Sequence, residues 1–199
     1  MKKIKLFLAS SIELKDDRKE FEIFINRKNK MWIDKDIFLE LIIWEDFLDA
    51  MSATSLQDEY NKAIRECDYF VMLFATKVGK YTEEEFDTAF KQYKSTSKPL
   101  IFTYFKDSSL ALNETDQNDV ESLQAFKEKI KELGHFYTRY RNIEGLREHF
   151  GNQLDKLVNK GFIEIEAGES STNDNNYTTY SQTATKIYNI THIDKAEFN

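Results

Sequence analysis

The sequence predicts an α/β fold of the flavodoxin-like, three-layer type, in which a five-stranded parallel sheet lies between flanking helices. Short apolar segments alternate along the chain with segments whose apolar residues recur at helical spacing. The short segments are rich in Ile, Leu, Val and Phe and show little polar alternation, which is typical of strands buried on both faces of a parallel sheet. Strict alternation of strand and helix requires crossovers that return each strand parallel to the last.

Five strands and about five helices are expected before residue 160. The apolar segments predict strands over residues 4–9, 37–44, 69–75, 100–105 and 135–140. Apolar residues at intervals of three and four predict helices over residues 14–32, 55–67, 82–94, 120–133 and 143–158. This number and order of elements suits a flavodoxin-like sheet.

The composition changes after residue 165. Residues 168–185 are rich in Ser, Thr and Asn and have almost no aliphatic side chains, which is typical of a linker. Residues 187–198 are too few to fold alone. We therefore expect one domain over residues 1–165, followed over residues 166–199 by a polar linker and a short connector or docking segment.

Charge and cysteine content exclude several classes of function. The net charge of −7 argues against a nucleic-acid-binding surface, because phosphate binding needs concentrated Lys and Arg. The single cysteine, Cys67, excludes a disulfide framework and a cysteine-based zinc site, and it favours a reducing, cytoplasmic location. Lys5 interrupts the apolar run at the start of the chain, which is too short for a signal peptide. No apolar stretch approaches the roughly 20 residues of a membrane-spanning helix, so no membrane partner is expected.

The most informative segment covers residues 79–90, directly after the predicted third strand. A glycine turn leads into a helix that opens with Glu83, Glu84 and Glu85. Ligands of open α/β sheets bind beyond the carboxyl ends of the strands. A glutamate at this point is therefore a helix cap or a catalytic group. Residues 82–85 fit a capping box with Thr82 at the N-cap and Glu85 at its third position, and residues alone favour that reading.

The helical pattern distinguishes Glu85 from its neighbour. Glu85 lies one turn before Ala89 and borders the predicted buried face, whereas Glu84 shares its side with Thr88 and Lys91. Glu85 is therefore the candidate catalytic residue, with Glu84 as the fallback.

Other strand ends at the same edge of the sheet supply hydroxyls and aromatic rings. Such groups around one crevice suit a sugar–nucleotide ligand, because polar groups bind ribose hydroxyls and an aromatic ring stacks on a base. Ser10 and Ser11 have an alternative role as caps of the first helix, and Trp44 has one as a core residue. The candidate substrate-binding residues are Ser10, Ser11, Trp44, Phe47 and Tyr81.

Over about residues 1–160 the chain resembles bacterial TIR-like domains. The resemblance is carried by the segments 5–11, 44–46, 55–68, 69–74 and 79–89. It is similar to the variant group whose third helix opens with Thr-x-x-Glu-Phe, here residues 82–86, and it lacks the Trp-Cys-x-x-Glu-Leu form of plant and animal TIR domains.

The resemblance implies a five-stranded parallel sheet and cleavage of NAD⁺ at the nicotinamide–ribose bond, with NAD⁺ as substrate and no cofactor. It implies that Glu85 is the essential glutamate and that Ser10 or Ser11 is the serine after the first strand. It assigns residues 44–54 to the BB loop, which mediates assembly into homo-oligomers through TIR–TIR contacts. The end of the chain resembles the connector that precedes a STAND-type ATPase sensor domain in bacterial defence proteins.

Three functions follow as hypotheses. The first is an NAD⁺ glycohydrolase effector of antiphage defence that self-association activates. The second is a TIR-like interaction and signalling module without enzymatic activity. The third is an enzyme similar to nucleoside deoxyribosyltransferases, which share a similar sheet and use a glutamate.

Overall fold

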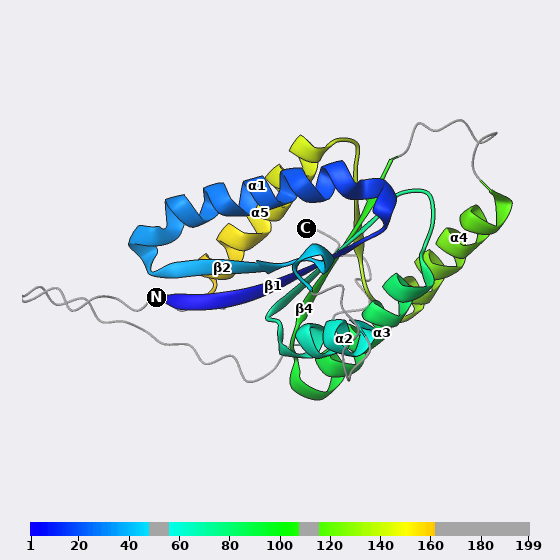
Figure 1. Ribbon diagram of the computed structural model, residues 1–199, viewed down its shortest axis with the longest axis horizontal. Coiled ribbons are helices and arrows are strands. Elements are labelled where there is room, and N and C mark those ends of the chain that lie inside the picture. Colours follow the sequence, from blue (N-terminus) through cyan, green and yellow to red (C-terminus); the bar gives the residue numbers. More distant parts are fainter. Residues whose placement is uncertain (48–55, 108–115, 162–199) are drawn as a thin grey trace, which may run out of the picture. The chain divides into compact units, whose positions relative to one another are not determined.

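The computed structural model describes residues 1–47, 56–107 and 116–161, except for the side chains of Lys80 and Tyr81 (Figure 1). The sheet has five strands in the order β2-β1-β3-β4-β5, and every neighbouring pair is parallel. The strands are β1 (Lys2–Ser10), β2 (Ile37–Ile42), β3 (Tyr69–Phe74), β4 (Leu100–Lys106) and β5 (Tyr137–Tyr140). The predicted flavodoxin-like fold class is therefore confirmed.

Five α-helices cover the two faces of the sheet (Figure 1). They are α1 (Lys15–Trp32), α2 (Leu56–Glu66), α3 (Lys80–Thr96), α4 (Gln117–Glu132) and α5 (Ile143–Asn159). Short 3₁₀ turns are η1 (Ile12–Leu14), η2 (Ile33–Lys35) and η3 (Trp44–Asp46). No helix in the described ranges is both long and apolar enough to cross a bilayer.

Alternation along β1 shows why the sheet needs helices on both sides. Leu6 and Leu8 point into one apolar core, which α1 and α5 cover, whereas Phe7 and Ala9 point into the other, which α2, α3 and α4 cover. All four side chains are buried, so both faces of the central strand are dry. This explains the continuous apolar runs that predicted the strands.

Several predicted boundaries differ from the structure by two or three residues, such as the start of α4 at Gln117 rather than at residue 120, and two of them have a clear local reason. The second strand ends at Ile42 rather than at residue 44, because the Asp46 carboxylate accepts a hydrogen bond from the Ile43 N–H (3.0 Å) and turns the chain into η3. The fifth strand begins at Tyr137, after Gly134 adopts a positive φ of 73° at the end of α4. Helix α3 begins at Lys80, two residues before the predicted start.

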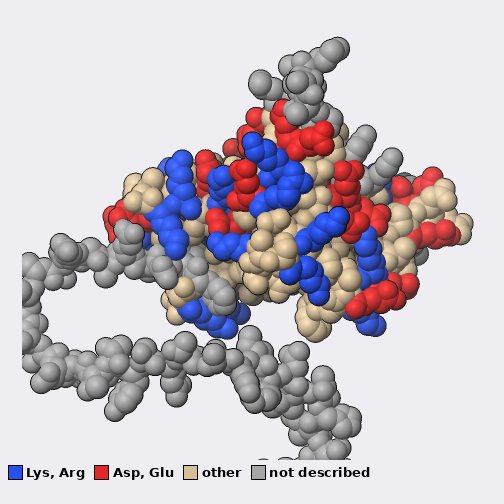
Figure 2. All heavy atoms as spheres, turned by 90° about the horizontal axis from the view of Figure 1, so that it is seen from below, with Lys and Arg blue, Asp and Glu red and all other residues tan. Residues whose placement is uncertain are grey.

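Part of the predicted organisation lies outside the described residues. This applies to residues 48–54 of the predicted BB loop and to the linker and connector predicted over residues 166–199. The boundary between domain and tail therefore stays a prediction. On the face shown in Figure 2, Lys and Arg side chains are interspersed with Asp and Glu side chains.

Candidate active site

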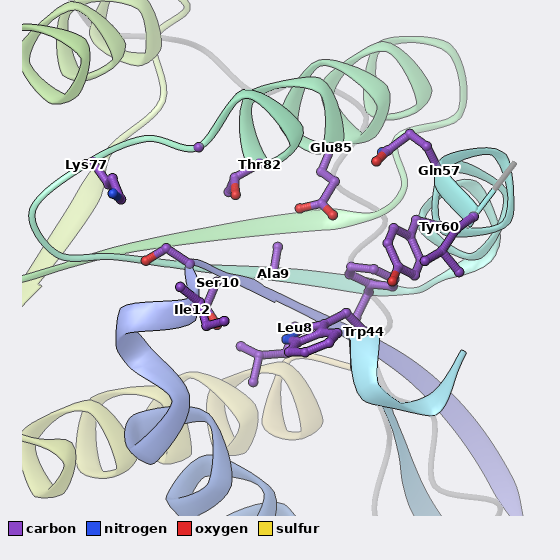
Figure 3. A pocket seen from close by; sticks show the side chains of 14 residues that line it. Leu8, Ala9, Ser10, Ile12, Trp44, Gln57, Tyr60, Lys77, Thr82 and Glu85 are labelled. Atoms are coloured by element: carbon purple, nitrogen blue, oxygen red, sulfur yellow. The ribbon is translucent and has the colours of Figure 1, made fainter. Parts of the chain in front are cut away.

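A pocket of about 670 Å³ opens at the carboxyl ends of β1 and β3 (Figure 3). Strand β2 lies on one side of β1 and β3 lies on the other, so the order of the strands reverses between β1 and β3. This position is the topological switch point of the sheet. Residues from β1, η1, η3, α2 and α3 surround it. The lining residues are Phe7, Leu8, Ala9, Ser10, Ser11, Ile12, Trp44, Leu56, Gln57, Tyr60, Lys77, Gly79, Thr82 and Glu85.

Glu85 is the acidic side chain of this pocket. It lies in the second turn of α3, only 8% of it is exposed, and its carboxyl group points into the pocket (Figure 3). Among the described residues, nothing forms a hydrogen bond or an ion pair with it. Burial, and next the nearby Glu84 carboxylate, raise the pKa of Glu85 from 4.5 to about 7. A group in this condition is partly ionised at neutral pH and can gain or lose a proton there.

The predicted capping box is wrong. Gly79 is the N-cap of α3, with an extended backbone (φ −69°, ψ 145°), and no side chain caps the helix. Glycine is among the residues that are favoured at the N-cap. Lysine and tyrosine, the next two residues, are both compatible with the first turn of a helix. Thr82 and Glu85 therefore lie within the helix, and the capping interpretation of Glu85 no longer accounts for it.

The three acids at the start of α3 point in different directions. Glu83 pairs with Lys129 of α4 (2.9 Å), and exposed Glu84 accepts a hydrogen bond from the Asn61 amide of α2 (3.0 Å). Only Glu85 of the three faces the pocket. The expectation that Glu85, and not Glu84, borders the buried face is confirmed.

The wall opposite α3 holds three predicted residues. Ser10 and Ser11 at the end of β1 line the pocket, and so does Trp44 of η3. Trp44 is 40% exposed, so the alternative of a core residue is wrong. The Ser11 hydroxyl donates to Glu13 (2.9 Å) and does not cap η1.

Arg18 of α1 supports this wall, a role that the sequence analysis did not predict. Arg18 is 1% exposed, its Nη1 donates to the Ser10 hydroxyl (2.6 Å), and its Nε donates to Glu45 (2.9 Å). Its guanidinium carbon lies 5.3 Å from the centroid of the Trp44 ring. One buried cation therefore fixes both the Ser10 hydroxyl and the exposed indole.

The two remaining predicted residues do not line the pocket as described. Phe47 packs behind it, edge-on to Tyr60 at 4.5 Å between ring centroids, so its role is to support that ring. Tyr81 lies in the first turn of α3, and its side chain is outside the described part of the structure.

Sequence reasoning missed Tyr60, Gln57 and Lys77 as lining residues. Tyr60 falls on the apolar stripe of α2, where the sequence alone does not distinguish an aromatic residue that lines a pocket from one that packs in the core. The hydroxyl group of tyrosine could have indicated this position, because a tyrosine ring usually lies where its hydroxyl can reach water or a polar group.

Comparison with protein families identifies the chain. The family model described as "Domain of unknown function (DUF4062)" matches residues 5–155. This chain belongs to that family. A search of curated proteins finds no match to the DUF4062 chain.

Among solved structures, the DUF4062 chain is similar to the Clostridium botulinum CMP N-glycosidase BcmB, with 16% identity and a TM-score of 0.46, over 74% of this chain and 98% of that chain. It is also similar to a conserved protein from Enterococcus faecalis V583, with 12% identity and a TM-score of 0.44, over 76% of this chain and 99% of that one. At these scores neither likeness bears on function.

Proposed function

We propose that this chain is an NAD⁺ glycohydrolase that cleaves the nicotinamide–ribose bond, as its resemblance to bacterial TIR-like domains implies. The observation that carries the proposal is Glu85: a buried carboxyl group without a described partner, directed into a pocket at the switch point of the sheet. Proteins seldom bury such a group unless something else compensates it. A cationic substrate would provide that compensation.

The chemistry suits a single carboxylate. The nicotinamide of NAD⁺ is positively charged and leaves as a neutral base, so the leaving group needs no proton. Positive charge then develops on the ribose, as in glycoside hydrolysis. The ionised Glu85 carboxylate, held in a largely apolar pocket, stabilises that charge more strongly than it would in water.

The pocket also offers contacts for the nicotinamide ring and the ribose. Trp44 and Tyr60 line the pocket and present aromatic surfaces for the nicotinamide ring. The Ser10 hydroxyl, which Arg18 holds in place, is a hydrogen-bonding partner for the ribose. Activation by self-association through TIR–TIR contacts, a cytoplasmic location, a downstream STAND-type sensor domain and a role in antiphage defence form part of the same proposal and derive from the resemblance.

A second candidate is an N-glycosidase that acts on nucleosides or nucleotides with an uncharged base. The observation that favours it is the pKa of Glu85, raised to about 7. A carboxyl group that is substantially protonated at neutral pH can act as a general acid on a leaving base.

The pH dependence of kcat/KM distinguishes the two candidates. If Glu85 acts as an anion on NAD⁺, nicotinamide release rises with pH and levels off above about pH 7, because the ionised form is active. If Glu85 is a general acid, the rate of base release falls above about pH 7. The assay uses protein clustered by fusion to an oligomeric carrier, with NAD⁺, CMP and cytidine as substrates.

Glu85→Gln is the decisive variant and Glu84→Gln its matched control. Glu85→Gln removes the charge and keeps the shape, and we expect at least about a hundredfold loss of rate. Glu84→Gln should keep the rate within about twofold, since Glu84 faces the solvent. Equal activity of Glu85→Gln and wild type would remove Glu85 from the mechanism. Clustered wild type that consumes none of the substrates would favour the non-enzymatic interaction module.

A further inference from the structure

We propose that the amino end of α3 is an anion subsite that binds the diphosphate of a nucleotide substrate. Its components are the Thr82 hydroxyl, the Lys77 amine and the N–H groups of the first turn of α3. The assignment to a substrate diphosphate rests on the proposed function, and it defines the direction in which the substrate lies.

The amino end of α3 has features that favour the binding of an anion. Helix α3 has 17 residues, and its N-cap, Gly79, has no side chain to cap the first turn. The first N–H groups of a helix have no acceptor within the helix and carry partial positive charge. The acid in that turn, Glu83, is engaged with Lys129 of α4 at 2.9 Å. The N–H groups that follow Gly79 therefore have no carboxylate of their own turn to neutralise them.

Thr82 is the independent observation that indicates a ligand. Only 7% of this residue is exposed, it lines the pocket, and its hydroxyl has no hydrogen-bond partner within the described part of the chain. A Cβ placed on Gly79 would lie 3.5 Å from the Thr82 Oγ1, so the hydroxyl lies beside the uncapped start of the helix. Among the described residues, the fully buried side-chain atom without a hydrogen bond is Arg18 Nη2, so the Thr82 hydroxyl is still reachable from the pocket, where a phosphate oxygen could accept its hydrogen bond.

Lys77 adds a full positive charge at the same end. Its amine pairs with Asp119 at 3.5 Å, and both side chains are substantially exposed. Exposed pairs of this kind contribute little, so the amine is free to turn toward a phosphate. Lys77, Thr82 and Glu85 lie in this order along the pocket, with Tyr60 beyond Glu85 and Trp44 on the wall that faces Glu85 (Figure 3).

This order fixes the orientation of the substrate. Thr82 and Glu85 are three residues apart on one helix face, which separates their Cβ atoms by about 5–6 Å. A diphosphate at Thr82 therefore places the attached ribose at Glu85 and the leaving base between Tyr60 and Trp44. The Glu85 carboxylate repels phosphate, which keeps the diphosphate at the helix end.

The test compares Lys77→Met and Thr82→Val with Lys98→Met, which changes an exposed lysine just before β4, at the opposite edge of the sheet. Binding of inorganic pyrophosphate is measured by NMR titration, and cleavage is measured with NAD⁺ and with nicotinamide riboside, which lacks the diphosphate. We expect Lys77→Met and Thr82→Val each to weaken pyrophosphate binding about tenfold and to raise KM for NAD⁺, but not for nicotinamide riboside. Lys98→Met should match wild type in all three measurements.

The outcomes separate the subsite from the proposed reaction. Pyrophosphate that binds Glu85→Gln at least as tightly as wild type, and Lys77→Met more weakly, supports the subsite even if no NAD⁺ is cleaved. Wild type that fails to bind pyrophosphate overturns it. So does a Lys77→Met variant whose pyrophosphate affinity and KM for NAD⁺ are unchanged, even if NAD⁺ is cleaved. Lys77→Met carries the test if Thr82→Val lowers the melting temperature.

Discussion

Two carboxyl groups are buried to the same degree, and the protein treats them in opposite ways. Asp17 of α1 is 7% exposed and Glu85 of α3 is 8% exposed. Asp17 pairs with the Lys106 amine at 2.8 Å and accepts a hydrogen bond from the Tyr140 hydroxyl at 2.7 Å. Burial, and next the bond to Asp17, raise the pKa of Tyr140, so its hydroxyl stays protonated and continues to donate. Within the described ranges Glu85 has no comparable partner.

The comparison shows that burial alone does not mark a functional carboxylate. Asp17 joins α1 to the ends of β4 and β5, and its charge is balanced inside the fold. Glu85 faces a pocket large enough for a ligand, and no side chain in the described ranges balances its charge. A buried charge that the fold leaves uncompensated lowers stability, and such groups concentrate at active sites.

The largest expected effect is the loss of stability caused by Asp17→Ala. The substitution leaves the Lys106 amine and the buried Tyr140 hydroxyl without their acceptor. We expect the free energy of unfolding to fall by about 2–4 kcal/mol at pH 7, since removing one member of a buried pair is strongly destabilising and Lys106 is only partly exposed. Urea denaturation measures it. The control is Asp16→Ala, an exposed neighbour, which should change stability by less than about 0.5 kcal/mol. If Asp17→Ala and Asp16→Ala lowered the stability equally, Asp17 would not be balanced by partners inside the fold.

Glu85→Gln should raise the free energy of unfolding rather than lower it, and the size of the increase should depend on pH. The pKa of Glu85 is raised in the folded state, so the folded protein retains a proton that the unfolded chain has lost between about pH 4.5 and pH 7. Wild-type stability therefore falls with rising pH across this window, whereas the variant has no such loss. We expect Glu85→Gln to be more stable than wild type by about 1–3 kcal/mol at pH 8 and nearly equal to it at pH 4.5.

Thermal unfolding at several pH values measures this difference, with Glu84→Gln as the control. Glu84→Gln should show a clearly smaller gain across this window, because it removes only the lesser of the two causes that raise the pKa of Glu85. A Glu85→Gln variant that is less stable than wild type at pH 8 would show that the carboxylate has a stabilising partner after all.

The fold was predictable because its signals are local. Continuous apolar runs such as residues 69–74 are buried on both faces of the sheet, and the helical stripe of α3 placed Glu85 correctly on the buried side. The start of α3 was not predictable from the same pattern. A Thr-x-x-Glu box and an N-cap glycine three residues earlier are both acceptable starts, and the chain adopts the earlier one.

The support of the site was not predictable because it depends on tertiary contacts. Arg18 and Trp44 are 26 positions apart and meet only when α1 packs beside the end of β2. In the sequence Arg18 is one of many charged residues on an amphipathic helix, and such residues are usually solvated. The Asp17 cluster is similar, since its partners lie at the ends of β4 and β5.

The smallest expected effect tests whether Arg18 positions the pocket wall. In Arg18→Lys the charge near Glu45 remains, but an ammonium group cannot bond both Ser10 and Glu45 while stacking on the indole. Loss of that stacking removes about 0.5–1 kcal/mol, which we expect as a two- to fivefold rise in KM for NAD⁺ with kcat within twofold of wild type. Acrylamide quenching should show greater access to Trp44, with the buried Trp32 as an internal reference. Arg27→Lys, at an exposed position of the same helix, is the matched control. If Arg18→Lys leaves both quenching and KM at wild-type values, the indole holds its place without Arg18, and the difference between the two carboxylates rests on Glu85 alone.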